Sequence, residues 1–230
     1  MYTLVIGNRN YSSWSLRAWL YLRLSEISFD EIRIPLFTGS WQEEIARYSP
    51  AGRVPVLLDE DLAVWDSLAI VEYIRERHTD AISWPLAPAA RAHAWSIVAE
   101  MHSGFMALRD ELPQNIRAQN LREWPDLSEV CRSEIQRINE IWGTCRRKYR
   151  SAGPWLFGSL SIADIMFAPV ALRFATYSIP LPDSAGDYVR SIQDLDLIKE
   201  WSALSEAEPE SLEFIDKRTV PANTLTGSDE

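Results

Sequence analysis

The first 35 residues change their apolar spacing twice, and this change limits the folds that the chain can adopt. Residues 2–6, YTLVI, form a largely apolar run of the kind found in a strand buried on both faces. From Leu16 onward, apolar residues recur three or four positions apart, which predicts one amphipathic helix. Residues 29–35 are short and rich in β-branched side chains, which predicts a second strand. This order predicts a βαβ unit with parallel strands.

The pattern continues with a short helix and a hairpin. Residues 41–50 predict a helix that ends before Pro50, because the residue before a proline disfavours helical geometry. Residues 54–58 and 62–65 predict two strands, and the three acidic residues between them indicate a tight connection. We therefore expect an antiparallel hairpin at this point.

A further helix follows the hairpin, and Asp66 and Ser67 are candidates for its N-terminal cap. The resulting order, βαβαββα, is the thioredoxin-like arrangement, which we expect over residues 1–79. The segment 78–88 contains two prolines and no clear period, which indicates a linker. Residues 89–218 show only helical spacing, so the predicted fold class is an α/β domain followed by an all-helical domain.

Two apolar stripes support the helical domain, and one of them carries both cysteines. Cys131 and Cys145 are 14 positions apart on one predicted helix, about 21 Å, which is too far for a disulfide. We expect free thiols in a reducing compartment. The stripes comprise Leu127, Cys131, Ile135, Ile138, Trp142, Cys145 and Tyr149, and Ala94, Trp95, Val98, Met101, Phe105 and Leu108.

Charge and composition exclude several classes of function. The net charge of −10 disfavours binding to a nucleic acid, because most of the surface would repel phosphate. The first ten residues lack the basic start and long apolar run of a signal peptide or membrane anchor, so we expect a cytoplasmic protein without membrane binding. The three histidines show no metal-ligand spacing with each other or with the cysteines, so no metal is expected.

Three serines, Ser12, Ser13 and Ser15, lie where the first strand gives way to the first helix. A hydroxyl at this position ordinarily caps the helix, worth about 1 kcal/mol. The same hydroxyl, backbone N–H groups and helix dipole also stabilise an anion such as a thiolate. No GxSxG or CxxC motif surrounds the serines, and no histidine occurs in the first 77 residues. A thiol would therefore have to arrive with a ligand.

Two other short motifs point to the same kind of ligand. Pro55 stands at the start of a predicted strand, where a cis bond after Val54 would leave the Val54 backbone free to pair with an extended peptide. Asp66 and Ser67 have two readings, a plain helix cap or a site in which Ser67 binds a carboxylate and Asp66 pairs with an ammonium group. Sequence alone leaves both the isomer of the bond and the role of the pair open.

Four motifs occur in order along the chain: SSWSLR at 12–17, GRVPVL at 52–57, DSLAIVEYI at 66–74 and PWLFGSLSIADIMFAPV at 154–170. Together they resemble the glutathione transferase family over nearly the whole chain, and the serine motif is similar to that of the zeta and theta classes. This resemblance implies glutathione as co-substrate, a homodimer, and a small, largely apolar electrophile bound between the two domains.

The resemblance also implies roles for single residues. Ser12 matches the serine that donates a hydrogen bond to the glutathione sulfur, with Ser13 beside it. Val54 matches the residue before the cis-proline, Pro55, and pairs with the cysteinyl backbone of glutathione. The pair that matches the binding site for the γ-glutamyl end is Asp66 and Ser67.

In the second domain, Ser161 and Asp164 match a helix-capping pair, which we assign to folding. Two positions depart from the zeta pattern. Trp14 stands where the zeta class has cysteine, and Thr176 stands where zeta-class isomerases have an arginine that holds a dicarboxylate. Arg173 lies one turn before Thr176 and is the candidate to replace that arginine, so Trp14 and Arg173 are the candidates for the electrophile pocket.

The sequence therefore predicts an enzyme, a glutathione transferase that stabilises the thiolate through Ser12. The alternatives are a glutathione-dependent isomerase resembling maleylacetoacetate isomerase, a peroxidase, or an interaction module of the same fold without catalysis. Whether Ser12 or Ser13 donates to the sulfur, and which electrophile is used, stay open.

Overall fold

The fold is described from a computed structural model, over residues 1–118, 126–149 and 153–219. The chain divides into two compact units that do not follow chain order strictly. One unit comprises Met1–Trp84 together with Asp196–Glu210, and the other comprises Pro85–Leu195 together with Ser211–Glu230.

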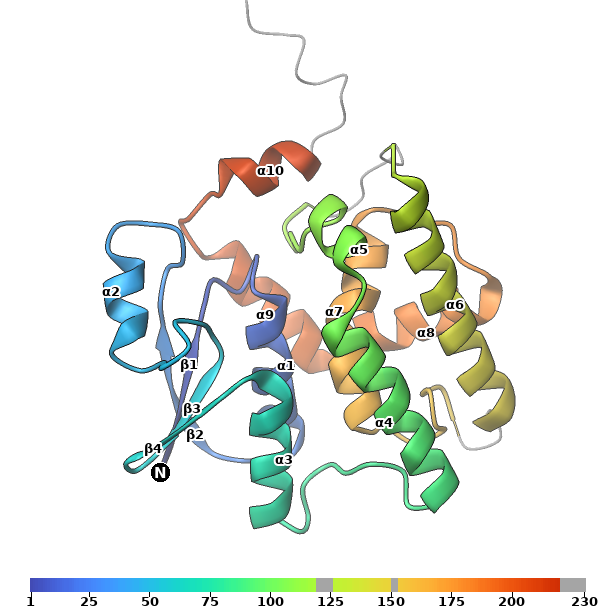
Figure 1. Ribbon diagram of the computed structural model, residues 1–230, viewed down its shortest axis with the longest axis horizontal. Coiled ribbons are helices and arrows are strands. Elements are labelled where there is room, and N and C mark those ends of the chain that lie inside the picture. Colours follow the sequence, from blue (N-terminus) through green and yellow to red (C-terminus); the bar gives the residue numbers. More distant parts are fainter. Residues whose placement is uncertain (119–125, 150–152, 220–230) are drawn as a thin grey trace, which may run out of the picture. The chain divides into compact units, whose positions relative to one another are not determined.

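A mixed four-stranded sheet lies at the centre of the first unit (Figure 1). Its strands are β1 (Tyr2–Ile6), β2 (Phe29–Arg33), β3 (Val56–Asp59) and β4 (Leu62–Trp65). They lie in the order β2-β1-β3-β4, where β1 pairs parallel with β2 and antiparallel with β3, and β3 pairs antiparallel with β4. The expected βαβ unit and hairpin are both confirmed.

Four helices belong to the same unit: α1 (Ser13–Leu24), α2 (Trp41–Ala46), α3 (Ser67–Arg77) and α9 (Asp196–Glu206). Figure 1 shows α2 on one side of the sheet and α1 and α3 on the other. Ile45 of α2 packs into a buried cluster with Val5, Ile34 and Val56 of the sheet layer. The thioredoxin-like arrangement expected from the sequence is therefore present.

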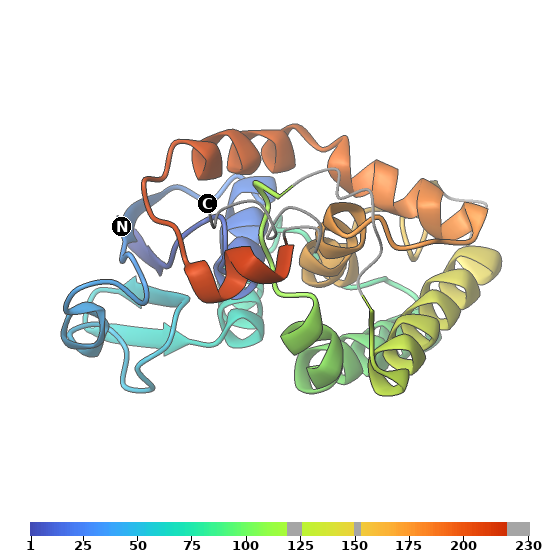
Figure 2. The same cartoon turned by 90° about the horizontal axis from the view of Figure 1, so that it is seen from above.

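Helix α9 lies alongside α1 within the first unit (Figures 1 and 2). The rings of Trp19 on α1 and Trp201 on α9 are 5.0 Å apart, and both side chains are buried. The expected second domain, 89–218, is therefore interrupted, since Asp196–Glu210 packs with the first unit. The apolar spacing of α9 predicts a helix but not the unit on which that helix packs.

The second unit is built from helices, with α7 at its centre. Nearly every residue of α7 is buried, because the helix is apolar on all sides and packs against both α4 and α8. Trp142 of α6 contacts the rings of Phe174 and Tyr188. The helices are α4 (Pro88–Ser103), α5 (Met106–Glu111), α6 (Glu129–Tyr149), α7 (Ile162–Thr176), α8 (Asp183–Gln193) and α10 (Glu213–Thr219).

A capping box starts α7, as the sequence predicts. One carboxylate oxygen of Asp164 accepts hydrogen bonds from the backbone N–H and the hydroxyl of Ser161, each at 2.9 Å. The other accepts from the backbone N–H of Leu156, also at 2.9 Å. Asp164 is fully buried, and this burial raises its pKa to about 6 despite the three hydrogen bonds.

The predicted stripe from Ala94 to Leu108 is not a single helix. Helix α4 ends at Ser103 and α5 begins at Met106, because Phe105 between them has a left-handed backbone with φ of 59°. On α6, by contrast, the predicted spacing holds, and Cys131 and Cys145 are both buried and free. No helix within the described ranges combines the length and apolar character needed to cross a bilayer.

Candidate functional site

Ser12 is the N-cap of α1, and its hydroxyl belongs to a small hydrogen-bonded group. Its oxygen accepts from the backbone N–H of Ser15 at 3.3 Å, and its hydroxyl donates to the Ser15 hydroxyl oxygen at 2.8 Å. The Ser15 oxygen also accepts from the backbone N–H of Gly7 at 3.0 Å. Ser12 is 8% exposed and Ser15 is fully buried. The capping role of Ser12 is therefore present, and its hydroxyl lies in the first turn of a helix that contains no acidic residue.

The neighbouring residues Ser13 and Trp14 take different places in the same turn. Ser13 is the first residue of α1 and is 6% exposed, and its backbone carbonyl accepts from the buried guanidinium of Arg17 at 3.2 Å. The guanidinium of Arg17 lies 4.5 Å from the centre of the half-buried Trp14 ring. A cation held in the first turns of α1 adds to the positive end of the helix dipole.

The Val54–Pro55 peptide bond is cis. Strand β3 begins only at Val56, so Val54 lies outside the ladder. Within the described residues, its backbone N–H and C=O form no hydrogen bond with another part of the chain. These two groups are therefore available to an extended ligand, in the manner of strand addition.

Asp66 and Ser67 lie at the start of α3. Asp66 has a φ of 76°, which is uncommon for a residue other than glycine, and its carboxylate accepts from the backbone N–H groups of Leu68 and Ala69. Ser67 is 1% exposed, and its hydroxyl has no hydrogen-bond partner among the described residues. A buried hydroxyl without a partner is costly, so this group marks a place where a polar ligand would be stabilised.

Strand register brings these motifs to one end of the sheet. Val5 pairs with Val56 and Val56 pairs with Trp65, so the end of β1, the start of β3 and the end of β4 lie side by side. Gly7 directly follows β1, and a side chain there would approach the Val54 side chain to 3.2 Å. The serine turn, the cis-proline and the start of α3 therefore share one edge of the first unit.

Arg173 lies in the second unit, on α7. It is 3% exposed, and its Nε and Nη1 atoms have no hydrogen-bond partner among the described residues. Burial and the nearby positive charge of Arg109 lower its pKa to about 10. Thr176, one turn later, donates a long hydrogen bond of 3.5 Å to the backbone carbonyl of Asn115. An uncompensated buried guanidinium favours a carboxylate ligand.

Two residues that contact this region were given no role of their own in the site from the sequence. Ser15 lies three positions after Ser12, and that helical spacing was a usable signal. Glu208 binds the loop before Ser12 from a distant part of the sequence, and no local pattern pointed to it. In the described parts of the chain, no group of three or more His, Cys, Asp or Glu side chains is placed to hold a metal ion.

Comparison with known proteins relates the chain to one family. Residues 11–77 match the family model described as the glutathione S-transferase N-terminal domain. The chain is 24% identical over 210 residues to glutathione S-transferase Z2 of Arabidopsis thaliana, covering 87% of this chain and 90% of that protein. It is 25% identical over 178 residues to maleylacetoacetate isomerase of Mus musculus, and this match covers 75% of this chain and 78% of the mouse protein.

A partial match and a solved structure extend this comparison. A probable maleylacetoacetate isomerase of Caenorhabditis elegans is 29% identical over 102 residues, and that match spans 47% of the nematode protein. A glutathione transferase homolog from Burkholderia, solved with bound glutathione, has a TM-score of 0.67 at 22% identity and covers 90% of this chain and 99% of its own. Residues 11–77 are therefore a glutathione S-transferase N-terminal domain, and over most of its length the chain is similar to enzymes of the glutathione S-transferase family.

Proposed function

We infer that the protein transfers glutathione to a small electrophile and that Ser12 stabilises the glutathione thiolate. The observation that carries this inference is the meeting, at one sheet edge, of three groups suited to a peptide thiol. These are the serine at the start of α1, the unpaired Val54 backbone before the cis-proline, and the unpartnered hydroxyl of Ser67.

The start of α1 supplies the electrostatics of the reaction. A free thiol has a pKa near 8.5 and is only a few per cent ionised at neutral pH. The Ser12 hydroxyl and the helix dipole favour the charged sulfur, which lowers the thiol pKa and releases its proton to solvent. The sulfur lone pair then forms a bond to an electrophilic carbon, and the leaving group departs with its bonding electrons.

The other two groups hold the peptide. The N–H and C=O of Val54 pair with the cysteinyl backbone of glutathione, as a strand would. Ser67 donates to the carboxylate of the γ-glutamyl end, while Asp66 pairs with its ammonium group. Ser13 lies beside Ser12 and contributes to the same end of the helix.

An isomerase is the second candidate, and Arg173 is the observation that favours it. Its guanidinium is buried with two unpartnered nitrogens, which suits a substrate that carries a carboxylate. Trp14 is the candidate for contact with the apolar part of the second substrate. An assay of an aryl halide, a conjugated cis-enedione and a peroxide separates conjugation, isomerisation and peroxide reduction.

Ser12→Ala tests the central role. We expect this variant to lose turnover by 100-fold or more, an order-of-magnitude figure for removal of one donor to a developing anion, while its affinity for glutathione changes little. Steady-state kinetics and calorimetric titration measure the two quantities. An unchanged rate refutes the role of Ser12. Failure of the wild-type protein to bind immobilised glutathione favours the interaction module instead.

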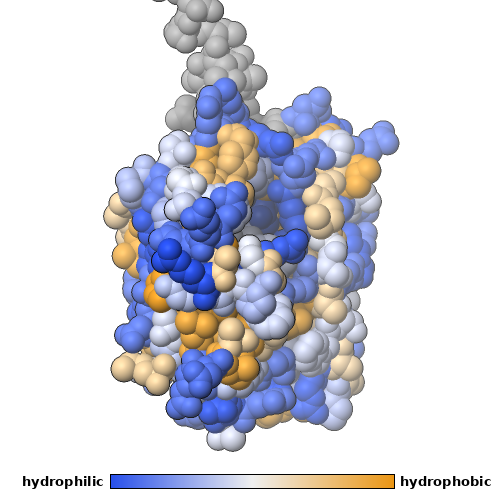
Figure 3. Space-filling model, turned by 60° about the vertical axis from the view of Figure 1, so that its left-hand side comes forward, coloured by the Kyte–Doolittle hydropathy of each residue, from blue (hydrophilic) through white to orange (hydrophobic). Residues whose placement is uncertain are grey.

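We also propose a homodimer, which the resemblance to the glutathione transferase family implies. Figure 3 shows apolar side chains in small groups between hydrophilic ones on one face of the molecule. In the first unit, Phe37, Leu62 and Trp65 are each about half exposed, and the last two lie on the edge strand β4. Light scattering at micromolar concentration tests this proposal, and a monomeric mass contradicts it.

A further inference from the structure

The loop that joins β1 to α1 is fixed by hydrogen bonds at four successive backbone N–H groups. Those of Tyr11 and Ser12 donate to the carbonyl of Asn8, at 3.2 and 2.8 Å. Those of Arg9 and Asn10 donate instead to the carboxylate of Glu208, at 2.9 and 3.3 Å. The backbone N–H groups of Arg9 and Asn10, the first two of the four, therefore depend on a side chain that follows α9.

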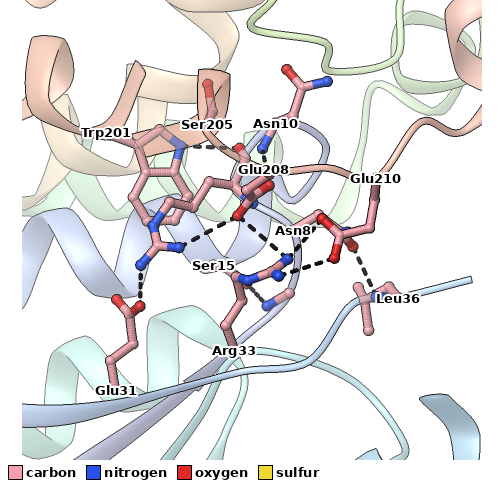
Figure 4. A network of polar contacts seen from close by, with 12 residues as sticks. Asn8, Asn10, Ser15, Glu31, Arg33, Leu36, Trp201, Ser205, Glu208 and Glu210 are labelled. Carbon is pink, nitrogen blue, oxygen red and sulfur yellow. Dashed lines mark hydrogen bonds and ion pairs between the residues drawn. The ribbon is translucent and has the colours of Figure 1, made fainter. Parts of the chain in front are cut away.

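Glu208 binds the loop as a buried anion (Figure 4). Its side chain is 5% exposed, and the guanidinium groups of Arg9 and Arg33 lie 3.4 and 3.7 Å from one of its oxygens. Arg33 in turn makes a two-pronged contact with Glu210, at 2.9 and 3.0 Å. Two cations and two backbone N–H groups compensate the charge, so the contact is both strong and directional.

A second contact from α9 holds the same loop from its carbonyl side. The indole Nε1 of Trp201 donates to the backbone carbonyl of Arg9 at 3.1 Å. The guanidinium of Arg9 lies 5.6 Å from the centre of the Trp201 ring, and its other end pairs with Glu31 on β2. The backbone N–H, the backbone carbonyl and the side chain of Arg9 are thus all held by α9 and the segment after it.

We propose that Glu208 is a positioning residue that sets the place of the Ser12 hydroxyl relative to the glutathione sulfur. The loop passes directly into the N-cap, and the Ser12 N–H shares its acceptor with Tyr11, so movement at Arg9 and Asn10 carries Ser12 with it. This inference rests on the proposed function of Ser12, and it assigns a role in that function to a segment outside the thioredoxin-like fold.

Glu208→Gln is the informative variant, because glutamine keeps the size of the side chain. It has one acceptor oxygen, so it can satisfy only one of the two loop N–H groups, and it leaves two buried arginines less well compensated. Glu200→Gln is the matched control, since Glu200 joins α9 to α1 through a two-pronged contact with Arg23 and, among the described residues, forms no hydrogen bond with the loop.

Three measurements are made on each variant. Hydrogen exchange reports the stability of the amides of residues 9–12, with or without ligand. Ultraviolet titration of bound glutathione gives the pKa of its thiol. The pH dependence of kcat/KM gives an independent, kinetic value for the pKa of the same thiol. For Glu208→Gln we expect faster exchange, a raised thiol pKa and a roughly tenfold lower kcat/KM at pH 6.5 that recovers at high pH. For Glu200→Gln all three stay at wild-type values.

The outcomes separate this inference from the proposed function. Unchanged exchange in Glu208→Gln overturns the anchoring of the loop. Faster exchange with an unchanged thiol pKa and pH profile shows a purely structural role and overturns positioning. A wild-type thiol pKa equal to that in buffer overturns the proposed function and positioning together, while exchange still reports whether Glu208 anchors the loop.

Discussion

Among single residues, Ser12 has the hydrogen bonds on which the proposed chemistry depends. Its one hydroxyl hydrogen points to Ser15, and donation to a sulfur requires that this bond be given up. The Ser15 hydroxyl keeps the N–H of Gly7 as a donor and is then free to donate back to Ser12. A chain of two hydroxyls would polarise the one that meets the anion.

Ser15→Ala tests this chain of hydroxyls. We expect turnover at neutral pH to fall roughly threefold to tenfold, less than for Ser12→Ala, because one polarising hydrogen bond to a donor is lost. The loss should shrink at high pH, where any bound thiol ionises unaided. Turnover equal to that of the wild-type protein across the whole pH range argues against the chain, and the unfolding midpoint of each variant controls for packing.

Asp66→Asn separates binding from capping. Asparagine retains a side-chain oxygen for the N–H groups of Leu68 and Ala69 and tolerates the positive φ, so α3 should keep its cap. Loss of the charge should weaken glutathione binding by about tenfold, with kcat nearly unchanged. Equal affinity in calorimetric titration removes Asp66 from the site.

At the scale of elements, the sequence predicted those whose signals are local. The strands, α1, α3 and the capping box of α7 follow from period, caps and turns that lie within a few residues of one another. The break between α4 and α5 was missed because the left-handed backbone of Phe105 interrupts a regular apolar spacing. Periodicity records which side chains are buried, and it does not record a change in helix direction.

Helix α7 depends on Asp164, and its removal should be costly. Asp164→Ala leaves the N–H groups of Leu156 and Ser161 without acceptors in a buried site, and we expect a loss of about 3 kcal/mol in unfolding free energy. Ser161→Ala removes a single hydroxyl and should cost about 1 kcal/mol. Urea unfolding measures the unfolding free energy of both variants. Equal losses in the two variants contradict the larger role that we assign to Asp164.

The raised pKa of Asp164 also predicts a pH dependence. The folded chain binds this proton more tightly than the unfolded chain, in which the pKa is near 3.8, so the contribution to stability is largest below about pH 4 and is lost as the pH rises through about 6. The Asp164→Asn variant should therefore lose less unfolding free energy than the wild-type protein between pH 4 and pH 7. If the unfolding free energies of the two proteins fall in parallel with pH, this prediction is contradicted. Asp187→Asn, which changes an exposed carboxylate on α8, is the control.

At the scale of the whole molecule, the sequence did not reveal how the chain is divided between its units. The expected boundary near residues 79–89 lies close to the observed division at Trp84, where prolines mark a linker. The return of Asp196–Glu210 to the first unit depends on Trp201, Glu208 and Glu210 finding partners in residues far away in the sequence. Such contacts leave no pattern in the segment itself.

A fragment of residues 1–84 should therefore be poorly folded. It lacks the partner of the buried Trp19 and the carboxylates of Glu208 and Glu210, so it exposes apolar surface of α1 and loses two of the ion pairs that fix Arg9 and Arg33. Fusion of residues 196–210 through a flexible linker should restore a cooperative thermal transition. Near-ultraviolet circular dichroism compares the two, and a cooperative transition in the short fragment refutes the expectation.

The same return of the chain affects how the protein is made. As the polypeptide leaves the ribosome, β1 to α3 emerge early, yet the helix that packs on α1 and the carboxylates that pair with Arg9 and Arg33 arrive only with residues 196–210. At 5–20 residues per second, that gap lasts between about 6 and about 25 seconds. During this interval the face of α1 around Trp19 lacks the helix that covers it in the folded protein.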